Sequence, residues 1–329
     1  MKQPIFDLHC DLLGQMIHMP SPDPYEKKGI GCSFPALKEG NVKLQVMAIF
    51  TPTTKGSTDI ALKQSKIFAS CLAKHPNDCH LVHDSNSLQN VISASKIGML
   101  AAIENASGFS EEGEPLEAGL KRLEQIIANT TRILYIGFTH HAENRFGGGN
   151  NSQTGLKDDG KTLLQYLNGK KIAVDFSHAS DALAYDILSY LNKHNLDIPI
   201  IASHSNYRSV FNHPRNLPDE LAIEIINRRG LIGLNFLRAF VNNDNPNALY
   251  EHINHGIELG GIDCICFGAD YFGTERHPDR SRVPFYFEEH KNASRYPLIL
   301  EQICDQVSPN AIENIASKNV FRFINALWN

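Results

Sequence analysis

Short apolar runs rich in β-branched residues recur along this chain, and stretches with helical periodicity separate them. The apolar runs predict eight strands, at residues 5–10, 44–50, 98–103, 133–139, 172–176, 198–202, 231–236 and 264–269. The periodic stretches predict helices at residues 58–74, 116–129, 181–193, 219–228 and 248–259, and after the last strand at 298–306, 310–315 and 319–327. Eight strands that alternate with helices predict an α/β fold, a closed parallel (β/α)₈ TIM barrel. Because nothing divides the chain, we expect one domain over residues 1–329, completed by C-terminal helices.

The first predicted strand carries a polar residue at every second position. Asp7, His9 and Asp11 alternate with apolar residues in F-D-L-H-C-D-L-L, so a regular strand places all three on one face. Burying three polar groups together is costly unless something binds them, and a metal ion would do so. The alternative for this segment alone is a half-exposed edge strand with alternating polarity.

Other predicted strands also end in ionisable residues, where barrel enzymes carry their active sites. These residues are Glu104, His140, His141, Asp175, His178, His204 and Asp270. Singly, a strand-end histidine can be a buried hydrogen-bonded residue, and a strand-end aspartate can cap the next helix. We keep that ordinary interpretation for His141 and Asp175.

The remaining set contains more ligands than one catalytic zinc ion needs. Carboxylates that meet without cations repel one another, whereas imidazole and carboxylate together are the usual zinc ligands. The candidate ligands are His9, Asp11, Glu104, His178 and His204. We therefore predict two zinc ions, bridged by Glu104 and by a water or hydroxide.

Composition restricts the partners and the compartment. The formal net charge is −5, and no block of like charge indicates nucleic acid or an anionic membrane. The seven cysteines form no disulfide framework, which favours a reducing compartment. The N-terminus has no signal-peptide core, and no stretch approaches the ~20 apolar residues of a membrane span. We expect a cytoplasmic protein without a membrane partner.

Seven motifs, in chain order, resemble those of the membrane (renal) dipeptidase family of zinc peptidases, in the amidohydrolase superfamily. D-L-H-C-D resembles the family's D-x-H-x-D, and A-I-E-N-A resembles the segment with its bridging glutamate. F-T-H-H-A-E-N resembles L-T-H-x-x-x-N, and V-D-F-S-H and I-A-S-H-S resemble two later histidine strands. R-N-L-P-D resembles R-N-x-x-D, and F-G-A-D-Y-F-G resembles F-G-x-D-F-D-G.

This resemblance implies a binuclear zinc dipeptidase in which a metal-bridging hydroxide attacks the scissile carbonyl. His9 and Asp11 would hold one zinc ion, His178 and His204 the other, and Glu104 both. The substrates it implies are small dipeptides with a free C-terminal carboxylate, with a D-residue tolerated at the C-terminal position. Related proteins are often dimers, so a homodimer is an open expectation.

The resemblance also implies roles for residues outside the ligand set. His140 would contact the substrate near the scissile carbonyl, Arg215 would hold the C-terminal carboxylate, and Asp270 would handle the proton at the scissile nitrogen. The sequence departs from the family at Phe272, where a second aspartate is common. The segment 271–295 is long and rich in aromatic and charged residues, and we expect a lid there; a solvated surface loop is the alternative.

Two other functions remain open from the sequence. A deacylase, a lactonase or another amide hydrolase would keep the metal ions and change the bond that is cleaved. A barrel that has lost catalysis and serves only in binding would show eroded ligands, and none of the five is eroded.

Overall fold

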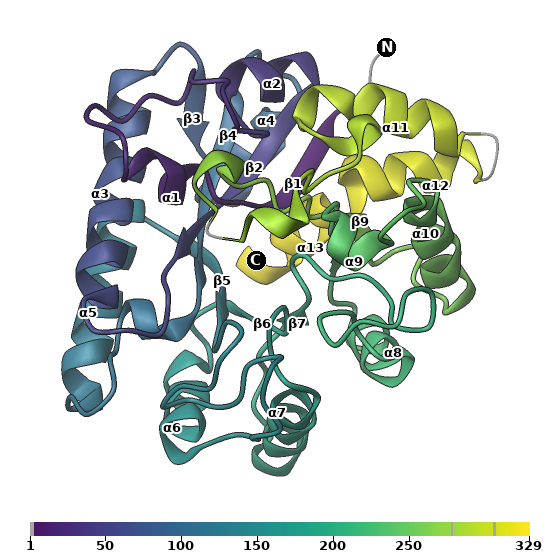
Figure 1. Ribbon diagram of the computed structural model, residues 1–329. Helices are drawn as coiled ribbons and strands as arrows, with labels where there is room; N and C mark the ends of the chain where they lie inside the picture. Colours follow the sequence, from purple (N-terminus) through teal and green to yellow (C-terminus); the bar gives the residue numbers. More distant parts are fainter. Residues whose placement is uncertain (1–2, 278, 305–306) are drawn as a thin grey trace.

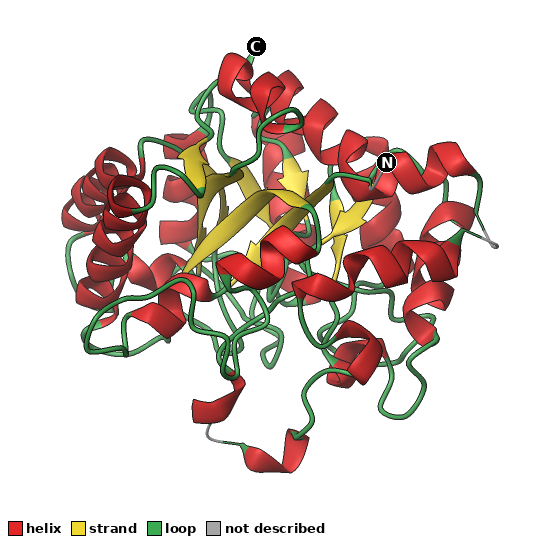
Figure 2. Ribbon diagram, turned by 90° about the horizontal axis from the view of Figure 1, so that it is seen from above, coloured by secondary structure: helices red, strands yellow, loops and turns green. Residues whose placement is uncertain are grey.

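Eight parallel strands form a barrel with helices around it (Figures 1 and 2). The structure is a computed structural model that describes residues 3–277, 279–304 and 307–329. The barrel strands are β1 (Ile5–Cys10), β2 (Val42–Phe50), β4 (Ile97–Glu104), β5 (Ile133–Gly137), β6 (Ala173–Asp175), β7 (Ile200–Ile201), β8 (Ile232–Leu234) and β9 (Ile265–Phe267). They pair in the order β7-β6-β5-β4-β2-β1-β9-β8. A parallel bridge between Ala202 and Ile232 joins the two ends of this path, which confirms the predicted barrel.

Each predicted strand overlaps one barrel strand; β2 and β4 extend beyond the predicted ranges 44–50 and 98–103, and the other differences also lie at the ends. One further strand, β3 (Cys79–Leu81), pairs with β4 outside the closed path. This strand was not predicted, because it has only three residues and His80 interrupts its apolar character.

Helices lie on the outside of the barrel (Figure 2). The longer ones are α3 (Ser57–Lys74), α5 (Leu116–Thr130), α6 (Asp158–Leu167), α7 (Asp181–His194), α8 (Asp219–Asn227), α10 (Ala248–Glu258), α11 (Tyr296–Ile303) and α13 (Asn319–Trp328). Short ones are α1 (Leu12–Met16), α2 (Phe34–Glu39), α4 (Ser85–Val91), α9 (Arg238–Val241) and α12 (Pro309–Glu313), and the π-helical turn η6 (Asn314–Lys318) joins α12 to α13. Helix α6 was not predicted. The helix predicted at 298–306 is α11, and residues 305 and 306 of that prediction lie outside the described residues.

The apolar core has an inner and an outer part. All eight barrel strands, or residues directly beside them, contribute to an inner cluster that includes Phe6 and Leu134. Val320, Ile324 and Trp328 of α13 belong to the same cluster, so α13 packs against the inside of the barrel at the end away from the site. The outer cluster lies between the strands and the surrounding helices. The mouth at the carboxyl ends of the strands is thereby left for polar groups.

Two general features bear on the predicted compartment and partners. None of the seven cysteines forms a disulfide, and six of them are buried. Among the described helices, none combines the length and the apolar character that crossing a membrane requires.

Candidate active site

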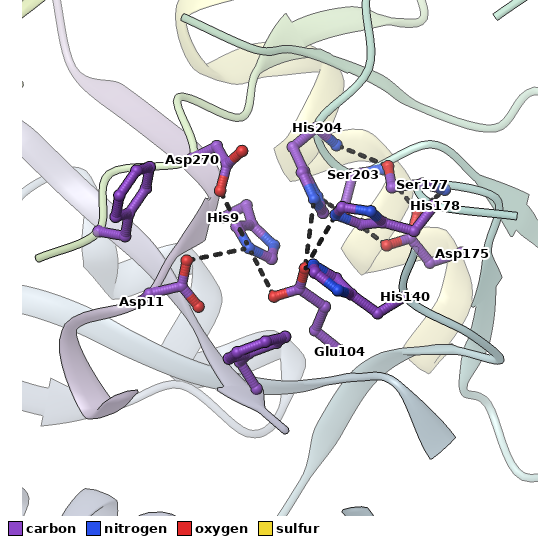
Figure 3. A network of polar contacts seen from close by, with 12 residues as sticks. His9, Asp11, Glu104, His140, Asp175, Ser177, His178, Ser203, His204 and Asp270 are labelled. Atoms are coloured by element: carbon purple, nitrogen blue, oxygen red, sulfur yellow. Dashed lines mark hydrogen bonds and ion pairs between the residues drawn. The ribbon is translucent and has the colours of Figure 1, made fainter. Parts of the chain in front are cut away.

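The predicted metal ligands meet at the carboxyl end of the barrel (Figure 3). His9 lies in β1 and Glu104 is the last residue of β4. His178 and His204 each follow the end of a strand by three residues, β6 and β7 respectively. All four are buried. Parallel strands therefore bring together side chains that are far apart in the sequence.

Glu104 lies between two groups of histidines. Its Oε2 is 3.2 Å from Nε2 of His9, while its Oε1 is 3.0 Å from Nε2 of His178 and 3.7 Å from Nε2 of His204. The two carboxylate oxygens thus face different imidazoles (Figure 3). This is the arrangement expected of a carboxylate that is shared between two cations.

Two aspartates complete the side of the site around His9. Nε2 of His9 is 3.9 Å from Oδ2 of Asp11 and 3.7 Å from Oδ1 of Asp270. Asp270 also accepts a hydrogen bond of 2.8 Å from Nδ2 of Asn235. Ligand atoms of His9, Asp11 and Asp270 lie within 4.8 Å of one another, as do those of His9, Glu104 and His204.

The electrostatics show that this cluster of carboxylates requires positive charge. Burial alone would lower the pKa of His9, but Glu104, Asp11 and Asp270 outweigh it and raise that pKa to about 10. Burial raises the pKa of Asp11 well above its usual range, and the charge of Glu104 adds to the effect. A divalent cation would supply the missing positive charge and stabilise the ionised carboxylates.

The donor set fits metal ions. Four buried ligand atoms have no hydrogen-bond partner in the described structure: His9 Nε2, Asp11 Oδ1, Glu104 Oε2 and His204 Nε2. A buried polar group without a partner costs about 1–3 kcal/mol, so four in one cluster indicate that a ligand satisfies them. Imidazole nitrogen and carboxylate oxygen suit zinc.

Neighbouring hydroxyls orient two of the imidazoles. The Tyr135 hydroxyl donates to the Leu8 carbonyl (2.9 Å) and lies 2.8 Å from Nδ1 of His9. Because the hydroxyl proton is donated to Leu8, the Tyr135 oxygen accepts from Nδ1–H of His9. A metal ion that displaces the second ring proton would then bind the lone pair of Nε2. Ser203 Oγ lies 2.7 Å from Nδ1 of His204 and 2.5 Å from Oδ2 of Asp175, and it fixes His204 in the same way.

The structure corrects two expectations about acidic residues. Asp175 does not cap a helix; it holds Ser203, and its partners are Ser203 and the backbone N–H groups of Ser177 and Ser203. Asp7 does not share a face with His9, because the pairing of β1 with β2 is irregular between Asp7 and Cys10. Asp7 bonds Tyr296 of α11 outside the barrel and accepts from the backbone N–H of His9 (2.8 Å), so it supports the strand rather than the imidazole.

Two site residues have strained backbones. His178 has φ 68° and Asp270 has φ 62°, in the left-handed region that residues other than glycine rarely adopt. Such a conformation costs on the order of 1–2 kcal/mol per residue. Both residues stand three positions after a strand end, and the unusual turn directs their side chains into the barrel mouth (Figure 3).

A cavity of about 360 Å³ opens above these ligands. Asp11, Glu104, His178 and Asp270 lie on its floor, and His140 and His141 contribute to one side. Nε2 of His140 is 3.7 Å from Oε1 of Glu104, and burial lowers the pKa of His140 to about 3. His140 is therefore a neutral imidazole in the position expected for a substrate contact.

Arg215 is buried beside the second histidine group. Its Nη1 donates to Ser205 Oγ (2.7 Å) and its Nη2 to the His204 carbonyl (3.0 Å), while Nε has no hydrogen-bond partner among the described residues. A guanidinium has five N–H donors, so three of them remain for another acceptor. Arg215 thus lies behind His204 and is not among the described residues that line the cavity, and its role in holding the substrate stays a prediction.

The sequence did not single out Asn150. Its Oδ1 lies 3.0 Å from Nδ1 of His141 and 3.2 Å from Nδ1 of His178, so one amide holds two imidazoles. Asn150 lies in the glycine-rich loop at 146–155, where Gly149 packs closely: a Cβ there would lie 2.1 Å from the His140 carbonyl oxygen. The glycines mark this loop in the sequence, but they do not predict that Asn150 contacts the two histidines.

Comparison with known proteins decides the family. A model of membrane dipeptidases (peptidase family M19) matches residues 1–328. The chain belongs to this family. Its enzyme class is therefore that of metal-dependent dipeptidases, as the seven motifs predicted. An eroded, non-catalytic barrel is not supported, because the five predicted ligands are present and lie together.

Solved structures show the same fold at low sequence identity. The metallopeptidase dipeptidase AC has a TM-score of 0.86 at 19% identity, over 100% of this chain and 99% of that one. A metallopeptidase from Rhodobacter sphaeroides, liganded with a phosphinate mimic of the dipeptide L-Ala-D-Ala, has a TM-score of 0.85 at 18% identity, over 100% of both chains.

Two relatives found by sequence match only part of this chain. A Klebsiella pneumoniae protein described only as uncharacterized is 27% identical over 230 residues, 65% of this chain and 80% of its own. Dipeptidase verJ of Clonostachys rogersoniana is 23% identical over 273 residues, 81% of this chain, and the match spans 64% of the verJ sequence.

Proposed function

We propose that this protein is a binuclear zinc dipeptidase that hydrolyses dipeptides with a free C-terminal carboxylate. His9, Asp11 and Glu104 would hold one ion, and Glu104, His178 and His204 the other. The observation that carries the proposal is the position of Glu104, whose two oxygens face His9 on one side and His178 on the other, at 3.2 and 3.0 Å. When bound, such ions would act as Lewis acids and lower the pKa of a water molecule, so that hydroxide is available to attack an amide near neutral pH.

The protein's own residues supply the remaining steps of hydrolysis. His140 is neutral, because burial lowers its pKa to about 3, so its ring N–H can donate to the carbonyl oxygen as negative charge develops there. Burial also raises the pKa of Asp270 to about 6, near neutrality, where a carboxylate can both accept and release a proton. Asp270 takes a proton from the attacking water and delivers it to the leaving nitrogen.

Arg215 provides the reason for a free C-terminal carboxylate. Its unpaired Nε–H and the free donors on its Nη atoms match the two oxygens of a carboxylate. The ligand of the Rhodobacter sphaeroides metallopeptidase mimics L-Ala-D-Ala, which supports tolerance of a D-residue at the C-terminal position here. An uncharged substrate would leave the buried charge of Arg215 unmatched.

The proposal has a direct test. The zinc-loaded protein is assayed with L,L- and L,D-dipeptides, each beside its C-terminal amide. We expect hydrolysis of the free acids, L,D-pairs included, and at least about tenfold lower kcat/KM for the amides, because a carboxylate held by Arg215 is lost. Equal hydrolysis of acids and amides would contradict the role of Arg215. Hydrolysis of N-acyl amino acids or lactones but of no dipeptide would replace the proposal with a deacylase or lactonase.

We also propose that the protein works in a reducing compartment. Seven cysteines without a disulfide support this, and cytoplasmic location and homodimer formation stay predictions.

A further inference from the structure

One wall of the active-site cavity is aromatic, and the proposed reaction does not use it. Phe272 and Phe285 lie with their ring centroids 5.3 Å apart, and the His277 ring is 5.6 Å from Phe272 and 4.7 Å from Phe285. All three line the cavity, and all three come from the segment 271–295. The expected lid is therefore, at least, a wall of the substrate site; its movement stays a prediction.

The wall is held in place by the barrel. The backbone N–H of Arg238 donates to the Phe285 carbonyl (2.9 Å), and Leu237 pairs with Tyr286 in an antiparallel bridge. The backbone N–H of Phe272 donates to the Tyr286 hydroxyl (3.3 Å). Leu237 also lines the cavity, so it extends the apolar surface beyond the aromatic rings. A surface fixed in this way can distinguish side chains by shape and polarity.

The charges around the cavity are unevenly placed. Among the described residues that line it, the carboxylates are Asp11, Glu104 and Asp270, all on the floor with the metal ligands. On the side of the aromatic wall, the charged residue that lines the cavity is Arg282. A cationic substrate side chain on this wall would lose its hydration without gaining an acidic partner.

The position of Arg215 indicates which end of a dipeptide meets this wall. Arg215 follows β7 and lies beside Ser205 and the His204 carbonyl, and it is not among the described residues that line the cavity, whereas Phe272 and Phe285 are. A dipeptide whose C-terminal carboxylate is held by Arg215 therefore has its N-terminal residue left for the cavity and its aromatic wall.

We propose that this protein selects dipeptides with a bulky apolar or aromatic N-terminal side chain, which packs on Phe272 and Phe285, and that it rejects cationic ones. The inference rests on the proposed dipeptidase function and deepens it by naming the substrate class. We assign the specificity to Phe272, because it lines the cavity and its ring contacts both His277 and Phe285.

The test compares kcat/KM for dipeptides that share one C-terminal residue and carry N-terminal Phe, Leu, Ala or Lys. The wild-type protein is expected to favour Phe and Leu over Ala and Lys by about tenfold or more. Phe272→Asp should shift the ratio of Phe to Lys substrates toward Lys by about tenfold or more, and Phe272→Leu should keep the apolar preference. Val283→Asp is the matched control, because Val283 lies on the same segment, is 48% exposed and is not among the residues that line the cavity.

The outcomes separate this inference from the function on which it rests. If the zinc-loaded wild type hydrolyses no dipeptide, the proposed function fails. If it hydrolyses dipeptides but favours Lys or Ala at the N-terminal position, the inference alone is overturned. An unchanged ratio of Phe to Lys substrates in folded Phe272→Asp would also overturn it, and the wild-type order of substrates tests it even if that variant does not fold.

Discussion

Replacing Ser203 by alanine would remove the hydroxyl that joins His204 to Asp175. Ser203 Oγ is 2.7 Å from Nδ1 of His204 and 2.5 Å from Oδ2 of Asp175. An ionised carboxylate only accepts, so the hydroxyl proton points to Asp175 and Nδ1–H of His204 donates to Ser203. This direction leaves Nε2 of His204 with a lone pair toward Glu104. The variant loses that control of the imidazole while it keeps the imidazole itself.

The magnitude follows from the contacts that are lost. Both partners are buried, so Nδ1 of His204 would be left without an acceptor, at a cost of about 1–3 kcal/mol in the free energy of unfolding. Removing a hydrogen-bond partner of a metal-binding histidine typically lowers metal affinity about 10–100-fold. We expect Ser203→Ala to weaken the ion held by His178 and His204 by that factor, and the ion at His9 much less.

The assay is a zinc titration against a competing chelator, with the cobalt-substituted protein as a spectroscopic check on which ion is released. Ser33→Ala is the matched control, because Ser33 is also buried but its Oγ has no hydrogen-bond partner in the described structure. If Ser203→Ala binds each of the two ions as tightly as the wild type does, Ser203 does not control the metal affinity of His204.

Three further predictions address the ligands, the loop and the core. His9→Ala should lose bound metal and activity together, and full activity with normal zinc content would rule out His9 as a ligand. Gly149→Ala should lower kcat/KM while the fold persists by circular dichroism, because its Cβ would lie 2.1 Å from the His140 carbonyl oxygen; unchanged kinetics would contradict this. Burial lowers the pKa of His252 from 6.5 to about 4, and its neutral ring accepts from Tyr207 N–H (3.2 Å) and donates to the carbonyl of Val241 (3.0 Å). As the pH falls, the unfolded state therefore binds the proton before the folded state does. The stabilisation by neutral His252, about 3 kcal/mol, is complete above pH 6.5 and is lost as the pH falls toward 4. The free energy of unfolding in urea should fall over this pH range in the wild type, and its dependence on pH should be weaker in His252→Asn.

The sequence predicted much of the fold because its signals are local. Periodicity located the barrel strands and the helix at 181–193. The start of that helix, α7, is also a local feature, because Oγ of the preceding Ser180 accepts from Leu183 N–H (3.0 Å). Helix α6 was not predicted, because its first turn, D-D-G-K, contains a glycine and three charged residues and so lacks the apolar periodicity that indicates a helix. Strand β3 was too short for any pattern.

The cluster of candidate ligands could be predicted from the sequence, but the residues that support it could not. Residue types that bind metals can be recognised at the ends of predicted strands, and the resemblance of the motifs to those of the family implies which metal ion each residue would hold. Tyr135 contacts His9 across 126 residues, and Ser203 contacts Asp175 across 28. No periodicity encodes such pairs, because the barrel brings them together only after it closes. The left-handed backbone of His178 is equally invisible in a sequence without glycine there.

The irregularity in β1 shows where the prediction of a shared face for Asp7 and His9 fails. Strict alternation placed Asp7 with His9, yet the irregular pairing with β2 turns Asp7 outward to Tyr296. His9 nevertheless lies in the cluster with Glu104, because its place at the end of the strand does not depend on that alternation. Periodicity in strands fails at such irregularities, which cluster near functional sites.

The central claim is that Glu104 is shared between two zinc ions, and the metal content of a Glu104 variant tests it most directly. The wild type and Glu104→Ala are loaded with zinc, freed of loosely bound metal and measured by elemental analysis, with the exposed Glu301→Ala as the control. The account predicts about two ions per chain in the wild type and in the control, and one or none in Glu104→Ala, with loss of dipeptide hydrolysis. Two tightly bound ions in Glu104→Ala, or one ion in a fully active wild type, would contradict it.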